Sequence, residues 1–324
     1  MMVRPAVAIV SSVGIALAAS TVAAQSFPAK PIRLLMPYPP GGGGDLVLRP
    51  LIERVTPLLN GHTMVVDYKP GANTVIATEM LAKAPPDGHT IAFIADPHSL
   101  NPIFRKDLPY DSLRDFAPIT QLVIVPFVLV VHPSIPATTL PELIAYAKAN
   151  PGKLAYASLG LGGPHYIAME WLKKLAGIDL LHVPYQGSAP ALNAGVAGQV
   201  QLMFVGASTG LTYARSNRLR AIASSPARRL AVAPELPAIA ESGFPEFDFA
   251  TWYGLIAPAR TPPEIVERLN ADITRVLRLP EIVERFAGLG LVSTPMTTVE
   301  FGAKLKADAE RYAQVIKLTG AKGE

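Results

Sequence analysis

The stretch from Met36 to Asp45 contains residue types suited to binding an anion. It holds four consecutive glycines, Gly41–Gly44, whose N–H groups can approach a ligand closely because no side chain intervenes. The apolar run Ile32–Met36 before them predicts a buried strand, and the apolar spacing of Leu46–Leu59 predicts a helix that Asp45 caps. Free N–H groups and the helix dipole both favour negative charge at such a junction. A flexible turn that binds nothing is the simpler alternative.

A second segment of this kind occurs near the middle of the chain. Leu154–Ala157 predicts a strand, Ser158–Pro164 a glycine-rich turn, and His165–Leu175 a helix. Two long apolar runs, Val123–His132 and Phe247–Ala257, are interpreted as segments that cross between two lobes. Strand-like and helix-like segments alternate throughout, which indicates an α/β protein with largely parallel sheets. We therefore expect the two glycine-rich turns to face one another across a cleft.

The sequence motifs for catalysis are incomplete. Gly206–Gly210 matches the G-x-S-x-G pattern with Ser208 at its centre, but all six histidines precede Ser208 and the hydrolase order needs one after it. We therefore interpret this match as a turn of small residues. No P-loop, complete dinucleotide motif or zinc-type histidine pair occurs, so we expect no cofactor and no metal.

Two further pairs of residues, Asp96 with His98 and Trp252 with Tyr253, are candidates for a functional role. Asp96 and His98 lie in an expected polar loop just after the predicted strand Thr90–Ala95, where α/β sheets bind ligands, although a solvated turn is an equal alternative. Trp252 and Tyr253 are expected to pack in the core. These positions leave acid–base chemistry with only scattered candidates.

Composition and the N-terminus limit the class of protein. The 324 residues suffice for two domains, and 50% hydrophobic with 17% charged residues is typical of a compact globular chain. A net charge of +4 without a long basic block argues against a nucleic-acid partner. The N-terminus predicts a cleaved secretory signal over residues 1–24, with a positive charge at Arg4, an apolar run at Ala6–Ala19 and small residues at Val22–Ala24. The apolar run is too short to span a membrane. The absence of cysteine excludes disulfides and thiolate sites, and we expect a periplasmic protein.

A series of motifs runs in order through the rest of the chain: Pro37–Asp45, Tyr68–Ala72, Ala82–Thr90, Leu108–Asp111, Asp115–Pro118, Asn150–Lys153, Tyr156–Ser158, His182–Ser188, Gly198–Phe204 and Trp252–Leu255. This series resembles the Bug or TctC-type periplasmic substrate-binding proteins of tripartite tricarboxylate transporters. The resemblance implies a type II periplasmic-binding-protein fold, with two α/β lobes joined by two crossing segments and a ligand cleft between them. It also implies a non-enzymatic, monomeric receptor that passes a small organic carboxylate to membrane permease subunits. We expect residues 25–124 and 253–324 to form the first lobe and residues 125–252 the second.

The resemblance assigns the ligand carboxylate to Pro40–Gly43 in the first lobe and to Ser158 and Gly162 in the second. Val205 stands where the family often has an aspartate that suits an ammonium group. Because a buried ammonium would be left unpaired there, we hypothesise a carboxylate with an apolar or aromatic body. The full set of expected ligand-binding residues is Tyr38, Pro40, Gly41, Gly42, Gly43, Asp45, Ala95, Asp96, His98, Ser158, Leu161, Gly162, Gly163, His165, Tyr185, Val205 and Ser208.

Two alternatives stay open at this point. A sensory receptor for a membrane signalling partner would use the same fold and pocket. An exported hydrolase or lyase would use Asp96, His98 or His165.

Overall fold

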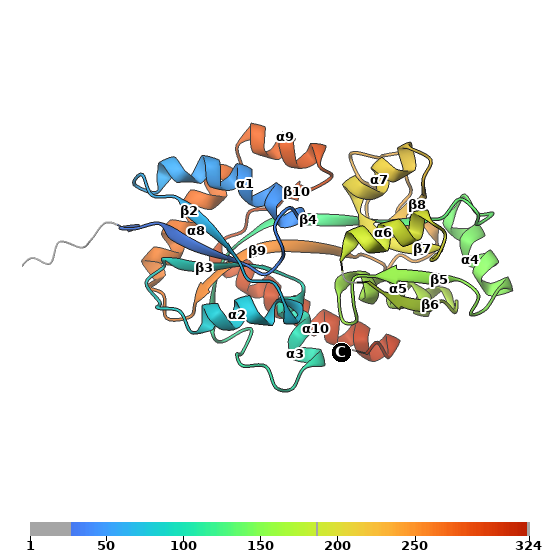
Figure 1. The fold of residues 1–324 in the computed structure, drawn as a ribbon, viewed down its shortest axis with the longest axis horizontal. Coiled ribbons are helices and arrows are strands. Elements are labelled where there is room, and N and C mark those ends of the chain that lie inside the picture. Colours follow the sequence, from blue (N-terminus) through green and yellow to red (C-terminus); the bar gives the residue numbers. More distant parts are fainter. Residues whose placement is uncertain (1–26, 186, 323–324) are drawn as a thin grey trace, which may run out of the picture.

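The computed structural model describes residues 27–185 and 187–322, so the predicted secretory signal lies outside the described residues. Two α/β lobes lie side by side and are joined by the long strands β4 (Phe116–Val131) and β9 (Ala250–Pro258) (Figure 1). Within the described ranges, no helix has the length and apolar character needed to cross a membrane.

The first lobe is built on a mixed sheet in the order β2-β1-β3-β9-β4, with β10 on β4. β1 is parallel to β2 and β3, whereas β9 is antiparallel to β3 and β4. Its remaining strands are β1 (Ile32–Met36), β2 (Met64–Tyr68), β3 (Thr90–Ala95) and β10 (Val292–Ser293). Its helices are α1 (Gly43–Val55), α2 (Val75–Ala82), α3 (Pro97–Phe104), α8 (Pro263–Leu277), α9 (Pro280–Gly288) and α10 (Thr298–Thr319), with short 3-10 turns at Thr56–Leu58 and Ala72–Thr74.

The alternation of side chains along β3 explains why both faces of this sheet are covered. Phe93 packs with α1, α8 and α9 on one face, whereas Ile94 packs with α2 and α10 on the other. Successive strand residues point to opposite faces, so a nearly continuous apolar strand needs helices on both sides.

The second lobe has its own sheet, in which β4, β7, β5 and β6 follow one another and β8 also pairs with β4. Its strands are β5 (Ala155–Ser158), β6 (Leu181–Pro184), β7 (Leu202–Gly206) and β8 (Arg220–Ser224). Its helices are α4 (Leu140–Ala149), α5 (Pro164–Ala176), α6 (Ser188–Val196) and α7 (Ala207–Arg215), with a 3-10 turn at Ile239–Ser242. α4 and α5 pack on one face, and α6 and α7 on the other.

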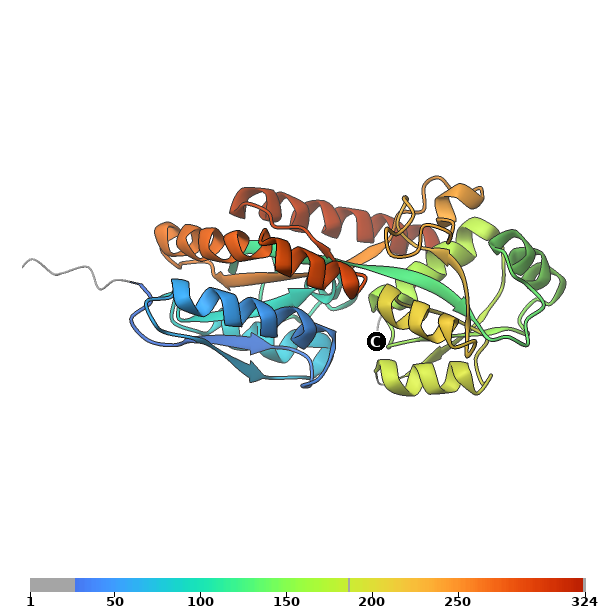
Figure 2. The same ribbon diagram turned by 90° about the horizontal axis from the view of Figure 1, so that it is seen from above.

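β4 and α10 each contact both lobes. β4 pairs with β9 as far as Pro126 and with β7 from Phe127 onward, which confirms the predicted crossing segment. α10 lies along both lobes (Figure 2), because its Phe301 packs in the core of the first lobe while its Tyr312 packs in the core of the second.

Three capping-box patterns in the sequence, Thr139–Glu142, Thr261–Glu264 and Thr297–Glu300, each predict the start of a helix, and two of the three predictions are correct. Thr139 and Thr297 accept the backbone N–H groups of Glu142 and Glu300, so both predicted caps are confirmed. The cap predicted at Thr261 is wrong, because α8 starts at Pro263 and no side chain caps it. The prediction of a polar loop after β3 is also wrong, because α3 begins directly at Pro97.

Candidate ligand-binding cleft

A cavity of about 210 Å³ lies between the two lobes. Its walls come from both lobes and from both crossing strands, and they comprise Gly43, Leu46, Val125, Phe127, Leu159, His165, Ser188, Gly206, Ala207, Ser208, Thr209, Thr251, Tyr253, Leu289 and Leu291. A second cavity of about 50 Å³ adjoins it inside the second lobe and includes Ser158 and Val205. The two cavities share Leu159, His165, Ser188, Gly206 and Thr209 as wall residues, so they lie next to each other.

The lobes approach each other closely on two sides of this site. A Cβ atom added at Gly290, after α9, would lie 3.1 Å from the backbone nitrogen of Ser208. One added at Gly162 would lie 3.0 Å from the ring of Phe104 on α3. These glycines therefore allow the lobes to pack with a small cavity between them.

The N-termini of helices from both lobes reach the cavity. α1 starts at Gly43 with Gly42 as its cap, and α7 starts at Ala207 after Gly206. The N–H groups of a first helical turn have no partner within the helix, and the helix dipole adds positive potential there. The structure thus supplies two donor groups suited to an anion, one on each side of the cavity.

Asp45 does not cap α1, which corrects the prediction. It is the third residue of the helix, is buried, and accepts hydrogen bonds from the N–H of Gly41 at 2.5 Å and the hydroxyl of Tyr68 at 2.9 Å. The N–H of Gly41 is therefore engaged within the loop. Gly43, not Gly41, is the glycine of this loop that lines the cavity.

Tyr253 extends over the start of α1. A Cβ atom added at Gly43 would lie 2.9 Å from the Tyr253 hydroxyl oxygen. Burial and the nearby Asp96 carboxylate raise the pKa of Tyr253 to about 12, so the phenol stays protonated and can donate a hydrogen bond. Tyr253 packs against the core of the first lobe, as expected, and in addition lines the cavity, while Trp252 is buried as expected.

Ser158 lies at the base of the smaller cavity and is almost fully buried. Its Oγ lies 2.6 Å from Nε2 of His182, accepts the N–H of Gly160 at 3.2 Å and lies 3.1 Å from the Gly160 carbonyl. These contacts fix the position of the hydroxyl oxygen within the loop after β5.

His165, at the start of α5, forms part of both cavities. Its ring stacks on Phe127 with centroids 4.5 Å apart, and burial lowers its pKa to about 4. The imidazole is therefore neutral at pH 7. Its Nδ1 is buried and has no hydrogen-bond partner among the described residues.

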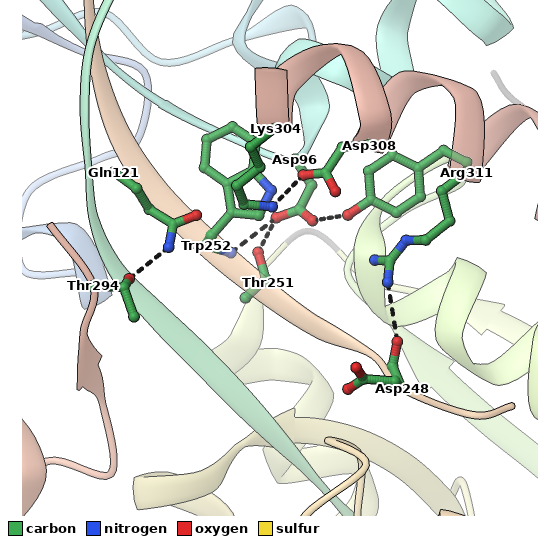
Figure 3. Close-up of polar contacts among 10 residues, drawn as sticks. Asp96, Gln121, Asp248, Thr251, Trp252, Thr294, Lys304, Asp308 and Arg311 are labelled. Atoms are coloured by element: carbon green, nitrogen blue, oxygen red, sulfur yellow. Dashed lines mark hydrogen bonds and ion pairs between the residues drawn. The ribbon is translucent and has the colours of Figure 1, made fainter. Parts of the chain in front are cut away.

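Asp96 lies behind the cavity wall, not in it. Its carboxylate is fully buried and accepts hydrogen bonds from the hydroxyls of Thr251 and Tyr312 and, at 3.3 Å, from the N–H of Trp252 (Figure 3). Burial raises its pKa, against the effect of the two hydroxyl donors. Because Thr251 lines the cavity, Asp96 supports the site at the junction of β3, β9 and α10.

His98 faces a different part of the first lobe. Its Nε2 lies 2.8 Å from the carbonyl of Ser112, and burial lowers its pKa to about 4. It borders a separate cavity together with Arg105 and Ser112. Asp96 and His98 therefore do not form an acid–base pair after β3.

Of the predicted ligand-binding residues, the cavity walls include Gly43, Ser158, His165, Val205 and Ser208. The others are not among the wall residues of these two cavities: Tyr38, Pro40, Gly41, Gly42, Asp45, Ala95, Asp96, His98, Leu161, Gly162, Gly163 and Tyr185. Sequence reasoning missed Ser188, Thr209, Thr251, Tyr253, Leu289 and Leu291.

The chemistry available in this site is that of anion binding. Its walls carry hydroxyls, helix N-termini and apolar groups, and none of the wall residues is an aspartate, glutamate, lysine or arginine. The Gly206–Gly210 segment is the start of α7 and not a turn, and no hydrogen bond joins Ser208 to a histidine among the described residues. No cluster of three metal-ligating side chains occurs within the described ranges.

Comparisons with known proteins agree with this architecture. The family model described as the tripartite tricarboxylate transporter family receptor, TctC, matches residues 47–320. The chain is 34% identical to protein BugT of Bordetella pertussis over 94% of each chain. A solved R. palustris structure with adipate is 29% identical, with a TM-score of 0.85 over 92% of this chain and 100% of that one. MatC of Rhodopseudomonas palustris with bound malate is 28% identical, with a TM-score of 0.79 over 90% of this chain and 100% of that one.

Proposed function

This chain belongs to the tripartite tricarboxylate transporter receptor family, TctC, and from that premise we propose that it is a periplasmic receptor for a small organic carboxylate. The family is one of solute-binding receptors and not of enzymes. The observation that carries the proposal is the cavity between the lobes, into which helix N-termini project from both sides. The receptor delivers its ligand to the permease subunits of a tripartite tricarboxylate transporter.

The size of the cavity limits the ligand. About 210 Å³ lies below the roughly 300–1,000 Å³ of pockets that bind drug-sized molecules, so the ligand is a small acid. Adipate and malate, which the two solved relatives contain, are acids of this class.

The walls favour a ligand with an apolar body. Phe127, Leu289 and Leu291 line the larger cavity, and Val205 lines the smaller one. None of the wall residues is an aspartate or glutamate, so the ammonium group of an amino acid would be buried without a partner, at a cost of several kcal/mol, on the order of the penalty for an unpaired buried charge. The ligand is therefore a carboxylate with an aromatic or aliphatic body, not an amino acid.

Donors from both lobes hold the carboxylate. In the first lobe these are the N–H of Gly43 and the hydroxyl of Tyr253, and in the second the N-terminus of α7 and the hydroxyl of Ser158. Contacts to both lobes stabilise the closed arrangement over an open one, because the ligand makes all of them only when the cleft is closed.

The experiment is a thermal-shift panel on the purified protein with benzoate, adipate, malate, citrate and glutamate, followed by chromatography of each mixture. Ligand at a hundredfold excess over Kd adds about 2.7 kcal/mol of stability, which corresponds to roughly 5 °C in Tm. We expect such a shift with benzoate, no shift with its neutral analogue benzamide, and recovery of every compound unchanged. A shift with glutamate alone would overturn the apolar-ligand proposal, and conversion of any compound would overturn the receptor.

A further inference from the structure

The hydroxyl group of Ser158 has one proton but more than one possible acceptor for it. The hydroxyl oxygen accepts the N–H of Gly160 at 3.2 Å, while the Gly160 carbonyl at 3.1 Å and Nε2 of His182 at 2.6 Å are both within reach of its proton. A serine hydroxyl can donate one hydrogen bond and accept two. It therefore cannot donate to His182 and to a ligand at the same time.

This inference rests on the proposed function and concerns the same site. We propose that His182 is a positioning residue, which determines whether the Ser158 hydroxyl donates into the ligand cavity. When Nε2 of His182 carries a hydrogen, it donates to the second lone pair of Ser158 Oγ. The Ser158 proton is then left for the Gly160 carbonyl or for a ligand carboxylate, and the charged acceptor makes the stronger bond.

The opposite state of His182 disfavours the ligand. When Nε2 lacks a hydrogen, it accepts the proton of Ser158, and the cavity then faces a hydroxyl oxygen that has only lone pairs to offer. An anion next to that oxygen gains no hydrogen bond. The two states of one imidazole nitrogen thus correspond to a donating and a non-donating Ser158.

The groups around His182 act on the protonation of its ring, and their net effect lowers its pKa. Its ring lies between Tyr156 of β5 and Tyr166 of α5, with centroids 5.0 and 4.7 Å away. Burial and Lys173 of α5 lower its pKa from the ordinary 6.5, whereas Glu170 on the same helix raises it. Glu170 is itself paired with Lys173 at 2.8 Å, and it accepts the hydroxyl of Tyr156 at 2.6 Å.

The proposal gives carboxylate binding a defined pH dependence. Neutral His182 is shared between two tautomers, whereas protonated His182 always donates from Nε2. Binding therefore tightens as the pH falls through the pKa of His182. His165, the other histidine of the site, stays neutral in this range because its pKa is lowered to about 4.

The test is calorimetric titration of benzoate between about pH 5 and 8, a range that extends below the ordinary histidine pKa in the direction of the shift and in which benzoate stays ionised. We expect the wild-type Kd to fall at least about twofold toward the acid end, because only the part of neutral His182 that carries its hydrogen on Nε2 leaves the Ser158 proton free for benzoate. His182→Phe keeps an aromatic ring between the two tyrosines but cannot titrate, so its Kd should not change with pH. Ser158→Ala should bind more weakly and be equally insensitive to pH.

A second measurement keeps the test valid if a variant folds poorly. The pKa of His182 in the wild type, followed by NMR, should rise on benzoate binding by at least about 0.3 unit, which is the same twofold coupling measured at the histidine. A pH-independent wild-type Kd, or a pH dependence that persists in His182→Phe, would overturn the role of His182 while leaving the receptor intact. Failure of benzoate and of every other acid in the panel to bind at any pH would instead overturn the proposed function.

Discussion

Replacing Tyr312 by phenylalanine tests how the two lobes are held at their junction. The Tyr312 hydroxyl donates to the fully buried carboxylate of Asp96, whose other donors are the Thr251 hydroxyl and the Trp252 N–H. Tyr312 lies on α10 with its ring in the core of the second lobe, while Asp96 follows β3 of the first. The substitution removes one oxygen atom and leaves the apolar contacts of the ring in place.

The expected loss follows from the burial of Asp96. Removing one hydrogen-bond partner of a buried polar group costs about 1–3 kcal/mol, and Asp96 has no contact with solvent that would replace the lost donor. We therefore expect Tyr312→Phe to lower the free energy of unfolding by about 2 kcal/mol in urea denaturation. Tyr146→Phe is the matched control, because Tyr146 packs on the same core and its hydroxyl makes no hydrogen bond among the described residues.

A double-mutant cycle separates this hydrogen bond from a packing effect. If Tyr312 acts through the Asp96 carboxylate, Tyr312→Phe should cost at least about 1 kcal/mol less in an Asp96→Asn background than in the wild type. A loss in the single variant no larger than that of Tyr146→Phe would refute the reasoning, and so would equal costs in the two backgrounds.

Three further predictions concern the cleft and the pH dependence of folding. Gly43→Ala places a methyl group 2.9 Å from the Tyr253 hydroxyl oxygen, and the overpacking of about 1 kcal/mol should weaken benzoate binding at least fivefold in calorimetry. In the double variant, Tyr253→Phe removes the hydroxyl and should restore room for the methyl group. Losses of affinity that simply add in the double variant would contradict this. The Asp45→Asn variant should lose about 1 kcal/mol of stability in urea, since its carboxylate accepts the Gly41 N–H and the Tyr68 hydroxyl; an unchanged midpoint would argue against that role. The pKa of His98 is lowered to about 4 in the folded state, so on acidification the histidine is protonated in the unfolded state before it is protonated in the folded state. The free energy of unfolding should therefore fall by about 3 kcal/mol between pH 6.5 and 4. An NMR titration that places the pKa of His98 near 6.5 would contradict this.

The architecture was predictable from local patterns and from the family motifs. The strand Thr90–Ala95 was predicted with its observed ends. The apolar run from Val123 is longer than one strand of a single sheet usually is, and it indicated a strand that crosses between the lobes. The capping boxes at Thr139 and Thr297 were correct, since their reciprocal hydrogen bonds are local.

The errors arose where contacts distant in sequence decide the outcome. Asp96 looked like a ligand residue because it follows a strand end, but its partners Thr251 and Tyr312 are distant in the chain. Asp45 looked like a cap, but the glycines before it already adopt helical conformation from Gly43. Tyr253 could have been found from the sequence, since strand alternation places it on the face opposite to the buried Trp252.

The central claim is that a small carboxylate binds in the cavity between the lobes, and calorimetric titration of benzoate against three forms of the protein tests it most directly. Thr209 lines both cavities, so Thr209→Trp should fill them and abolish binding. Thr212→Trp, one turn further along α7 at an exposed position, should bind like the wild type. Saturable binding in the wild type and in Thr212→Trp, with none in Thr209→Trp, is the expected result. Equal binding in all three forms would contradict the site.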